Sequence, residues 1–264
     1  LGVLATNGAS GSGSVAIGPE GMRFFKTSMP SDIAAWRLYL SGLTNTILVS
    51  KTSVPIPTAN DLNQSGQMLV VPPYLVGGLQ YFVGVAGNPG LSMNLDSRQQ
   101  PFTDIPFSST TNLNIVGFDY AVFRVQVPVD EIAWQVSVVV SNGNPNVAVR
   151  RGLVPNENNN DAYSEVAGTV TDSILLVPPT LSDGAFFITV YGTNNYTCQL
   201  QTGAPDITEI NFNSVTVNND PNRVGWRLFK VSDISQQLGA LGWDLFVTNL
   251  TAGTRIALRR NAAP

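Results

Sequence analysis

Short runs of alternating apolar and polar residues recur along the chain and are rich in Val, Ile, Phe and Tyr. Clusters of turn-forming residues, such as Asn142–Pro145 and Ser182–Gly184, separate these runs. Alternation with a period of two is typical of a β-strand that buries one of its faces. Because the sequence lacks long stretches of helical periodicity, we predict an all-β fold of tandem antiparallel β-sandwich modules, jelly-roll or immunoglobulin-like in type.

A strand motif with a tryptophan recurs about every hundred residues, which indicates an array of similar units. An alternating strand precedes each tryptophan strand, and a strand with a basic end follows it. In chain order these motifs are Arg23–Lys26, Ala35–Leu40 and Ile47–Lys51, then Val122–Val125, Ala133–Val138 and Val147–Arg151, then Arg227–Lys230, Gly242–Val247 and Ile256–Arg260. One tryptophan at the same strand position in every unit is best explained as a core anchor. We therefore predict that Trp36 and Trp134 are buried equivalents.

The first two units continue alike, whereas the third stops early. A double-proline corner and an aromatic strand complete the first two; these are Leu69–Pro73 with Gln80–Val85, and Leu175–Pro179 with Ala185–Val190. We predict one sandwich over residues 1–103, a second over 104–205, and the first half of a third over 206–264. A half-sandwich leaves a sheet edge open. We expect either that the chain continues past Pro264, which we favour, or that Leu1–Ala5 of a neighbouring copy completes the sheet.

This order of motifs resembles the bacterial pre-peptidase C-terminal domain, a jelly-roll-like β-sandwich appended to secreted peptidases and other exported proteins. The resemblance covers both complete units and half of the third, and Phe24–Phe25 keeps the family's Tyr-Tyr opening only in part. It implies an accessory, non-catalytic role associated with secretion, substrate engagement or calcium. It supplies no fixed catalytic residue to carry over.

Composition narrows the classes of partner. Charged residues make up 12% of the chain, against about 25% in an average domain, and this favours an exported protein. The 14 basic residues are spread thinly and the net charge is −4, which excludes the basic cluster that non-specific nucleic-acid binding needs. The longest apolar run, Leu69–Val76, is too short to span a bilayer. We predict an extracellular or cell-surface location; Leu1 in place of a methionine indicates a mature or excised piece.

The chain contains no histidine. This excludes Ser-His-Asp and Cys-His nucleophile activation and the usual zinc sites. Asp130 and Glu131 are neighbours on a predicted turn, unlike the two facing carboxylates of a glycosidase. The single cysteine, Cys198, lies in an alternating stretch, which predicts a small buried side chain. We predict that the chain is not an enzyme and needs no organic cofactor.

Two groups of residues are candidates for ligand binding. The run Asn156–Asp161 is rich in oxygen ligands, so Glu157, Asp161 and Glu165 are candidate calcium ligands. An asparagine-rich turn explains the same run and is favoured, because Asn tolerates a left-handed backbone. Aromatic side chains are the candidates for polysaccharide binding: Tyr74, Tyr163, Tyr191 and Trp226. Trp226 has no counterpart in the other units, which makes it the first of these to test.

The basic pair that ends a strand in the second and third units has two interpretations. Arg150–Arg151 and Arg259–Arg260 are favoured as charges that protect a sheet edge from pairing. The alternative is that they grip an anionic glycan.

The function predicted from these patterns is a non-catalytic extracellular repeat protein, acting as a structural or adhesive array or as a filament or surface-layer component. Its partners would be other copies of itself or adjoining repeats. The alternative is an accessory carbohydrate- or substrate-binding module of a larger secreted bacterial hydrolase, with polysaccharide as a partner.

Overall fold

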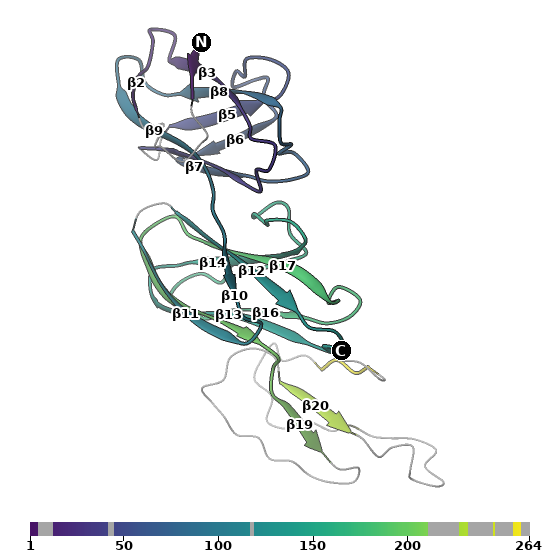
Figure 1. Ribbon diagram of the computed structural model, residues 1–264. Helices are drawn as coiled ribbons and strands as arrows, with labels where there is room; N and C mark the ends of the chain where they lie inside the picture. Colours follow the sequence, from purple (N-terminus) through teal and green to yellow (C-terminus); the bar gives the residue numbers. More distant parts are fainter. Residues whose placement is uncertain are drawn as a thin grey trace.

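The computed structural model describes residues 1–4, 13–41, 45–116, 119–210, 227–231, 245 and 256–259. In this part of the chain all regular secondary structure is β-strand, and the strands form mostly antiparallel sheets that pack face to face (Figure 1). The prediction of an all-β sandwich fold is confirmed. Within the same residues, no helix has the length and apolar character needed to cross a membrane.

The first sandwich consists of two sheets. Sheet 1a has the strand order β1-β3-β8-β5-β6, and sheet 1b has the order β2-β9-β4-β7. The strands are β1 (Gly2–Val3), β2 (Gly13–Ala16), β3 (Met22–Ser28), β4 (Trp36–Leu40), β5 (Thr46–Ser50), β6 (Leu62–Ser65), β7 (Gln67–Val70), β8 (Gln80–Ala86) and β9 (Ser92–Gln99). Strand β1 pairs in parallel with β3 of its own sheet. The segment considered as a donor strand, Leu1–Ala5, is therefore already used in its own sandwich, up to where the description stops at Leu4.

The second sandwich has the same strand order. Sheet 2a runs β10-β12-β17-β14-β15 and sheet 2b runs β11-β18-β13-β16. The strands are β10 (Thr103–Ile105), β11 (Ser109–Ile115), β12 (Tyr120–Val127), β13 (Trp134–Asn142), β14 (Asn146–Arg151), β15 (Ala162–Ser164), β16 (Asp172–Leu176), β17 (Gly184–Tyr191) and β18 (Tyr196–Gly203). The chain thus passes from one sandwich to the next between Gln99 and Thr103.

Each sandwich closes around its tryptophan, as predicted. Trp36 and Trp134 are fully buried. The Trp36 indole N–H donates to Ser97 Oγ at 3.0 Å, and the Trp134 N–H donates to Thr202 Oγ1 at 2.6 Å. A buried indole therefore keeps its polar atom satisfied while it fills the core. Cys198 is buried on β18, also as predicted.

The third part is described only in short segments. Strand β19 (Ile207–Ile210) pairs in parallel with β20 (Leu228–Val231), as β10 pairs with β12. Leu228 packs against Ala133 on the face of sheet 2b. Of the rest of the predicted third unit only Leu245 and residues 256–259 are described, and Trp243 lies outside the described residues.

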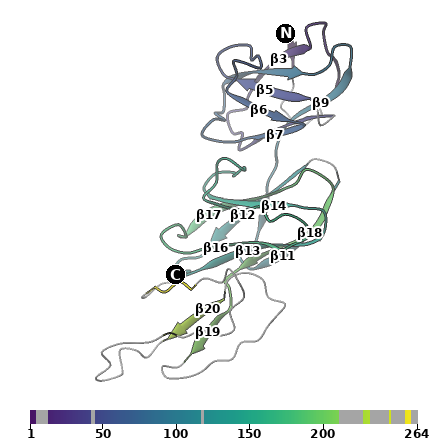
Figure 2. The same cartoon turned by 180° about the vertical axis from the view of Figure 1, so that it is seen from behind.

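The sheets are stacked in the order 1a, 1b, 2a, 2b and then β19-β20. Figures 1 and 2 show this layering from opposite sides, with β12, β14 and β17 between the first sandwich and sheet 2b. The outer face of sheet 2a packs on the outer face of sheet 1b, so the contact between the sandwiches is itself a sheet-on-sheet contact.

Candidate functional site: the junction between the sandwiches

The junction has an apolar centre. Side chains of sheet 2a and its following loop meet side chains at the start of β4 and the end of β7, and the buried members are Ala35, Leu69, Val71, Tyr120, Val122, Ala148, Val154, Phe187 and Tyr191. These residues are on the outer faces because strand alternation sends their neighbours, such as Trp36, Val70 and Phe186, into the sandwich cores. Burial of this apolar area holds the two sandwiches together.

Hydrogen bonds surround the apolar centre. Arg150 Nη1 donates to Pro72 O at 2.6 Å, and Asn156 Nδ2 donates to Leu69 O at 2.8 Å. Leu69 belongs to β7, which is an edge strand of sheet 1b, so these donors satisfy carbonyl groups that the sheet leaves open. In the other direction, Gln67 Nε2 donates to Gly192 O at 3.1 Å.

The structure corrects the interpretation of Arg150. Strand β14 lies between β17 and β15 rather than at a sheet edge, so the arginine does not protect an edge. Its guanidinium is used against the carbonyl of Pro72, next to a cis Pro72–Pro73 bond. Arg259 makes the matching contact with the carbonyl of Pro178, next to the cis Pro178–Pro179 bond. The same arginine-to-proline contact therefore occurs twice among the described residues; Arg260 lies outside them.

An ion-pair group lies on one side of the junction. Buried Arg37 pairs with Asp96 at 3.4 Å and with Asp119 at 3.3 Å, and Arg98 pairs with Asp119 at 3.1 Å. Burial raises the pKa of Asp96, and the nearby charge of Asp119 raises that pKa further. At the corresponding positions next to Trp134 and Thr202 the second sandwich has Gln135 and Gly203, so this charged group is specific to the first junction.

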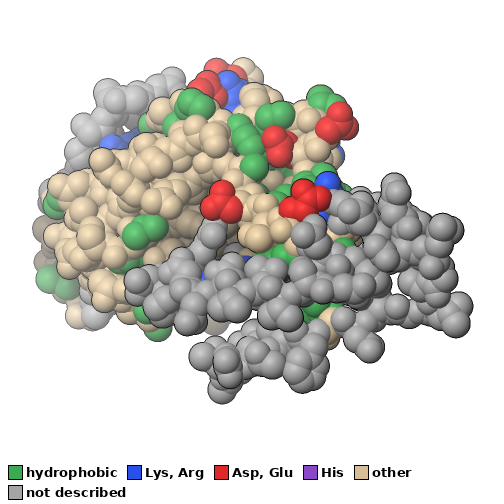
Figure 3. Space-filling view, turned by 90° about the horizontal axis from the view of Figure 1, so that it is seen from below, with side chains coloured by type: hydrophobic (Ala, Val, Ile, Leu, Met, Phe, Trp, Pro, Cys, Tyr) green, Lys and Arg blue, Asp and Glu red, His purple; other side chains and the backbone are tan. Residues whose placement is uncertain are grey.

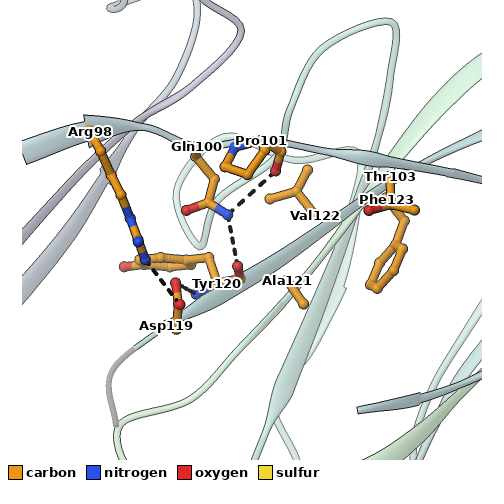
Figure 4. A pocket seen from close by; sticks show the side chains of 9 residues that line it. All are labelled: Arg98, Gln100, Pro101, Thr103, Asp119, Tyr120, Ala121, Val122 and Phe123. Atoms are coloured by element: carbon orange, nitrogen blue, oxygen red, sulfur yellow. Dashed lines mark hydrogen bonds and ion pairs between the residues drawn. The ribbon is translucent and has the colours of Figure 1, made fainter. Parts of the chain in front are cut away.

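A hollow of about 310 Å³ adjoins this group (Figure 4). Gln100 is only 6% exposed, and its Nε2 donates to Tyr120 O at 2.9 Å. Its Oε1 has no hydrogen-bond partner among the described residues, whereas Arg98 Nε lies 3.6 Å from Asp96 Oδ2. Pro101, Val122 and other apolar side chains line the opposite wall. The hollow therefore combines an open acceptor with an apolar surface.

The three candidate calcium ligands have separate roles. Asp161 Oδ2 accepts from Arg151 N at 2.7 Å, just as Asp61 Oδ2 accepts from Lys51 N at 2.9 Å in the first sandwich. Glu165 Oε1 accepts from the Tyr191 hydroxyl, and Glu157 Oε1 accepts from Gln64 Nε2 of the first sandwich. Among the described residues, no three His, Cys, Asp or Glu side chains gather to hold a metal ion. A calcium site at Glu157, Asp161 and Glu165 stays a prediction.

The asparagine-rich run forms a compact turn. Asn156 and Asn159 bridge each other through their backbones, and Asn160 Nδ2 donates to the carbonyls of Asn156 and Glu157. Asn60 makes the same pair of bonds to Ile56 and Pro57 in the first sandwich. The turn interpretation of this run is confirmed. It also positions Asn156 for its bond to Leu69 across the junction.

The aromatic candidates for sugar binding are placed differently. Tyr191 is buried in the junction and Tyr74 donates its hydroxyl to Asp61, so these two do not form an open binding surface. Tyr163 is exposed on β15. Trp226 lies outside the described residues. Sequence reasoning did not find Tyr120, Gln100 or the ion-pair group, because no motif marks residues that meet only across two sandwiches.

Comparisons with known proteins give a limited answer. No protein-family model matches the chain, and no curated protein sequence matches it. Among solved structures, the chain is similar to the pre-peptidase C-terminal domain of collagenase from Bacillus anthracis, with 16% identity over 39% of this chain and 95% of that domain, and a TM-score of 0.33. It is also similar to Aeromonas hydrophila PliG, a periplasmic inhibitor of g-type lysozyme, with 15% identity over 39% of this chain and 96% of that protein, and a TM-score of 0.29.

The domain type that the sequence motifs resemble is thus also found among the structural neighbours. Likeness of this size assigns neither a ligand nor an activity to the chain.

Glu157 gives the junction a testable pH dependence. Desolvation raises the pKa of Glu157 and the nearby charge of Glu165 raises it further, while the bond from Gln64 lowers it. A raised pKa in the fold means that ionisation of Glu157 costs stability as the pH rises from about 4.5 through the folded pKa. We expect Glu157→Gln to stabilise the chain at pH 7 by up to about 1 kcal/mol and to have no effect at pH 3.5. Thermal unfolding across this pH range measures it, and equal gains at both pH values would contradict it.

Proposed function

We propose that the chain is a non-catalytic, extracellular array of tandem β-sandwich modules that acts as a rigid structural or adhesive spacer. The observation that carries this proposal is the junction, where one sandwich rests on the next through an apolar centre and hydrogen bonds in both directions. A flexible string of binding domains needs no such contact. A spacer does, because it must hold its ends at a fixed separation.

The contacts at the second junction support the same function. Leu228 packs on Ala133 as Val122 packs near Ala35, and Arg259 reaches Pro178 O as Arg150 reaches Pro72 O. Stacking that repeats one contact builds a quasi-one-dimensional assembly, in which each module contacts only its neighbours. The surface also supports an extracellular location. Much of the described surface seen from below is neither charged nor apolar (Figure 3).

The experiment is a distance measurement between spin labels. Ser53→Cys and Asn142→Cys place labels on exposed positions of the two sandwiches, and Cys198 is buried. A rigid spacer gives one narrow distance distribution. A broad distribution contradicts the proposal, as does turnover of peptide or glycan substrates by the pure chain that a single carboxylate substitution abolishes.

A second candidate function is the binding of a neutral sugar at the hollow beside the junction. The unpaired Gln100 Oε1 favours it, because a sugar hydroxyl group can donate a hydrogen bond to it. The apolar wall suits the C–H face of a sugar ring. This corresponds to an accessory binding module of a larger secreted hydrolase.

Calorimetric titration with neutral mono- and oligosaccharides tests this candidate. Binding that Arg98→Ala abolishes and Tyr163→Ala leaves unchanged supports a site at the hollow. If no sugar binds, water alone satisfies Gln100 and the candidate fails.

A further inference from the structure

The ion-pair group at the junction is assembled from both sandwiches. Arg37 on β4 and Arg98 on β9 are partners in the register of sheet 1b, and strand alternation places both on its outer face. Asp96 lies on the same face, two residues before Arg98. Asp119 belongs to the second sandwich, directly before β12. The first sandwich therefore contributes three of the charged side chains of this group, and the second sandwich contributes one.

The outer face of sheet 1b has an excess positive charge that the next sandwich neutralises. Two arginines and one aspartate leave one positive charge without a counterpart on this face. Asp119 supplies the counterpart: its Oδ1 lies 3.3 Å from Arg37 Nε, and its Oδ2 lies 3.1 Å from Arg98 Nη2 (Figure 4). The Arg37 side chain is only 7% exposed, and a buried cation is costly unless acids balance it. The face therefore fits a sandwich that supplies a carboxylate at this place.

The second junction is neutral on both sides. On the outer face of sheet 2b the three charged residues of the first face have neutral counterparts, which the strand register identifies as Gln135, Gln201 and Gly203. Leu228 packs on sheet 2b as Val122 packs on sheet 1b. Three residues before Val122 the sequence has Asp119, and three residues before Leu228 it has Gly225. A neutral face is thus followed by a neutral residue at the position of the acid.

The apolar residues do not distinguish the two junctions. Sheet 1b presents Ala35, Leu69 and Val71 to the next sandwich. Sheet 2b presents residues of the same kind at the same places, namely Ala133, Leu175 and Val177. Since an apolar strand face suits either surface, discrimination between units depends on the charged positions, where a wrong neighbour leaves a buried charge unpaired.

We propose that Arg37 and Arg98 on one side of the junction and Asp119 on the other form a charge match that determines which sandwich can follow the first. The outer face of sheet 1b accepts a unit with a carboxylate at the Asp119 position. It disfavours a unit that is neutral there, as the third unit is, because docking would bury the excess positive charge. The charge match deepens the array function and rests on it, since the order of units matters only where units stack.

A double-mutant cycle in the whole chain tests the charge match. Asp119→Asn keeps an oxygen that can accept from Tyr120 N, but it leaves the excess positive charge unbalanced. Arg98→Gln leaves an excess negative charge instead. The double variant is balanced again, because Arg37 still pairs with Asp96 at 3.4 Å.

The measured quantity is the equilibrium between docked and separated sandwiches. The distance between spin labels at positions 53 and 142, recorded in a urea series, gives this equilibrium. Asp104→Asn is the matched control, since Asp104 pairs with Arg124 at 2.6 Å inside the second sandwich and changes no charge across the junction. Circular dichroism confirms that each variant is folded.

We expect each single variant to raise the equilibrium constant for separation about 10- to 100-fold, and the double variant to return to within about 5-fold of the wild type. Asp104→Asn should leave the constant unchanged. Single variants that separate no more readily than the wild type overturn the charge match, as does a double variant in which the two effects add. In either case a narrow wild-type distribution still supports the spacer, whereas a broad wild-type distribution overturns both.

Discussion

Replacing Trp134 by alanine is expected to lower the free energy of unfolding by about 3–5 kcal/mol, as other large aromatic-to-alanine changes in cores do. Trp134 is fully buried, its ring lies 5.4 Å from that of Phe186, and its N–H donates to Thr202. Truncation leaves a cavity between sheets 2a and 2b and removes the partner of a buried hydroxyl. Trp36→Ala should have a similar effect in the first sandwich, where the ring packs against Tyr81.

Urea denaturation followed by circular dichroism measures these changes. Trp134→Phe is the control, because it keeps most of the apolar volume and loses mainly the hydrogen bond to Thr202. An unchanged midpoint for both alanine variants would show that the tryptophans are not core anchors.

Leu69→Asp is expected to separate the two sandwiches. Leu69 is 3% exposed in the apolar centre of the junction, and its loss alone should cost about 2–5 kcal/mol. The introduced carboxylate would lie beside buried Arg37, whose guanidinium already pairs with Asp96 and Asp119, so docking would add a third buried acidic group to that ion-pair group. Leu69 points away from the core of its own sandwich, because its neighbours Met68 and Val70 point into it.

The result should appear as a change in cooperativity. We expect one thermal transition in the wild type and two in the variant, together with a broad distribution in the spin-label distance measurement. Leu79→Asp is a matched control, since Leu79 is exposed outside the junction. If Leu69→Asp still unfolds in one transition with an unchanged midpoint, the junction does not couple the sandwiches.

The buried tryptophans were predictable because they depend on local pattern. A large aromatic side chain on an alternating strand can be buried only in the core on one side of that strand. The register of the strands could not be predicted correctly from the sequence. The sequence motifs align Phe24 with Phe123, whereas the strand pairing makes Phe25 the equivalent of Phe123. A shift of one residue exchanges the core face for the outer face, and the neighbouring strand decides it.

The burial and contacts of the Arg150 and Tyr191 side chains depend on the neighbouring sandwich. Both have the sequence context of surface residues, a basic strand end and an aromatic beside a turn. Both are drawn into the junction because the outer face of sheet 2a lies against the first sandwich. Likewise, Glu157 and Glu165 are close enough in sequence to suggest a shared ion, yet their hydrogen bonds go to Gln64 and Tyr191 instead.

The sequence by itself determined the all-β class, the buried tryptophans and the compact asparagine turn, because period-two alternation, aromatic burial and Asn turn chemistry act over a few neighbouring residues. Only the tertiary structure decided which outer sheet faces meet and which charges pair across the junction. The contacts across the junction arise between residues such as Arg37 and Asp119, far apart in the chain, whose proximity no local pattern encodes.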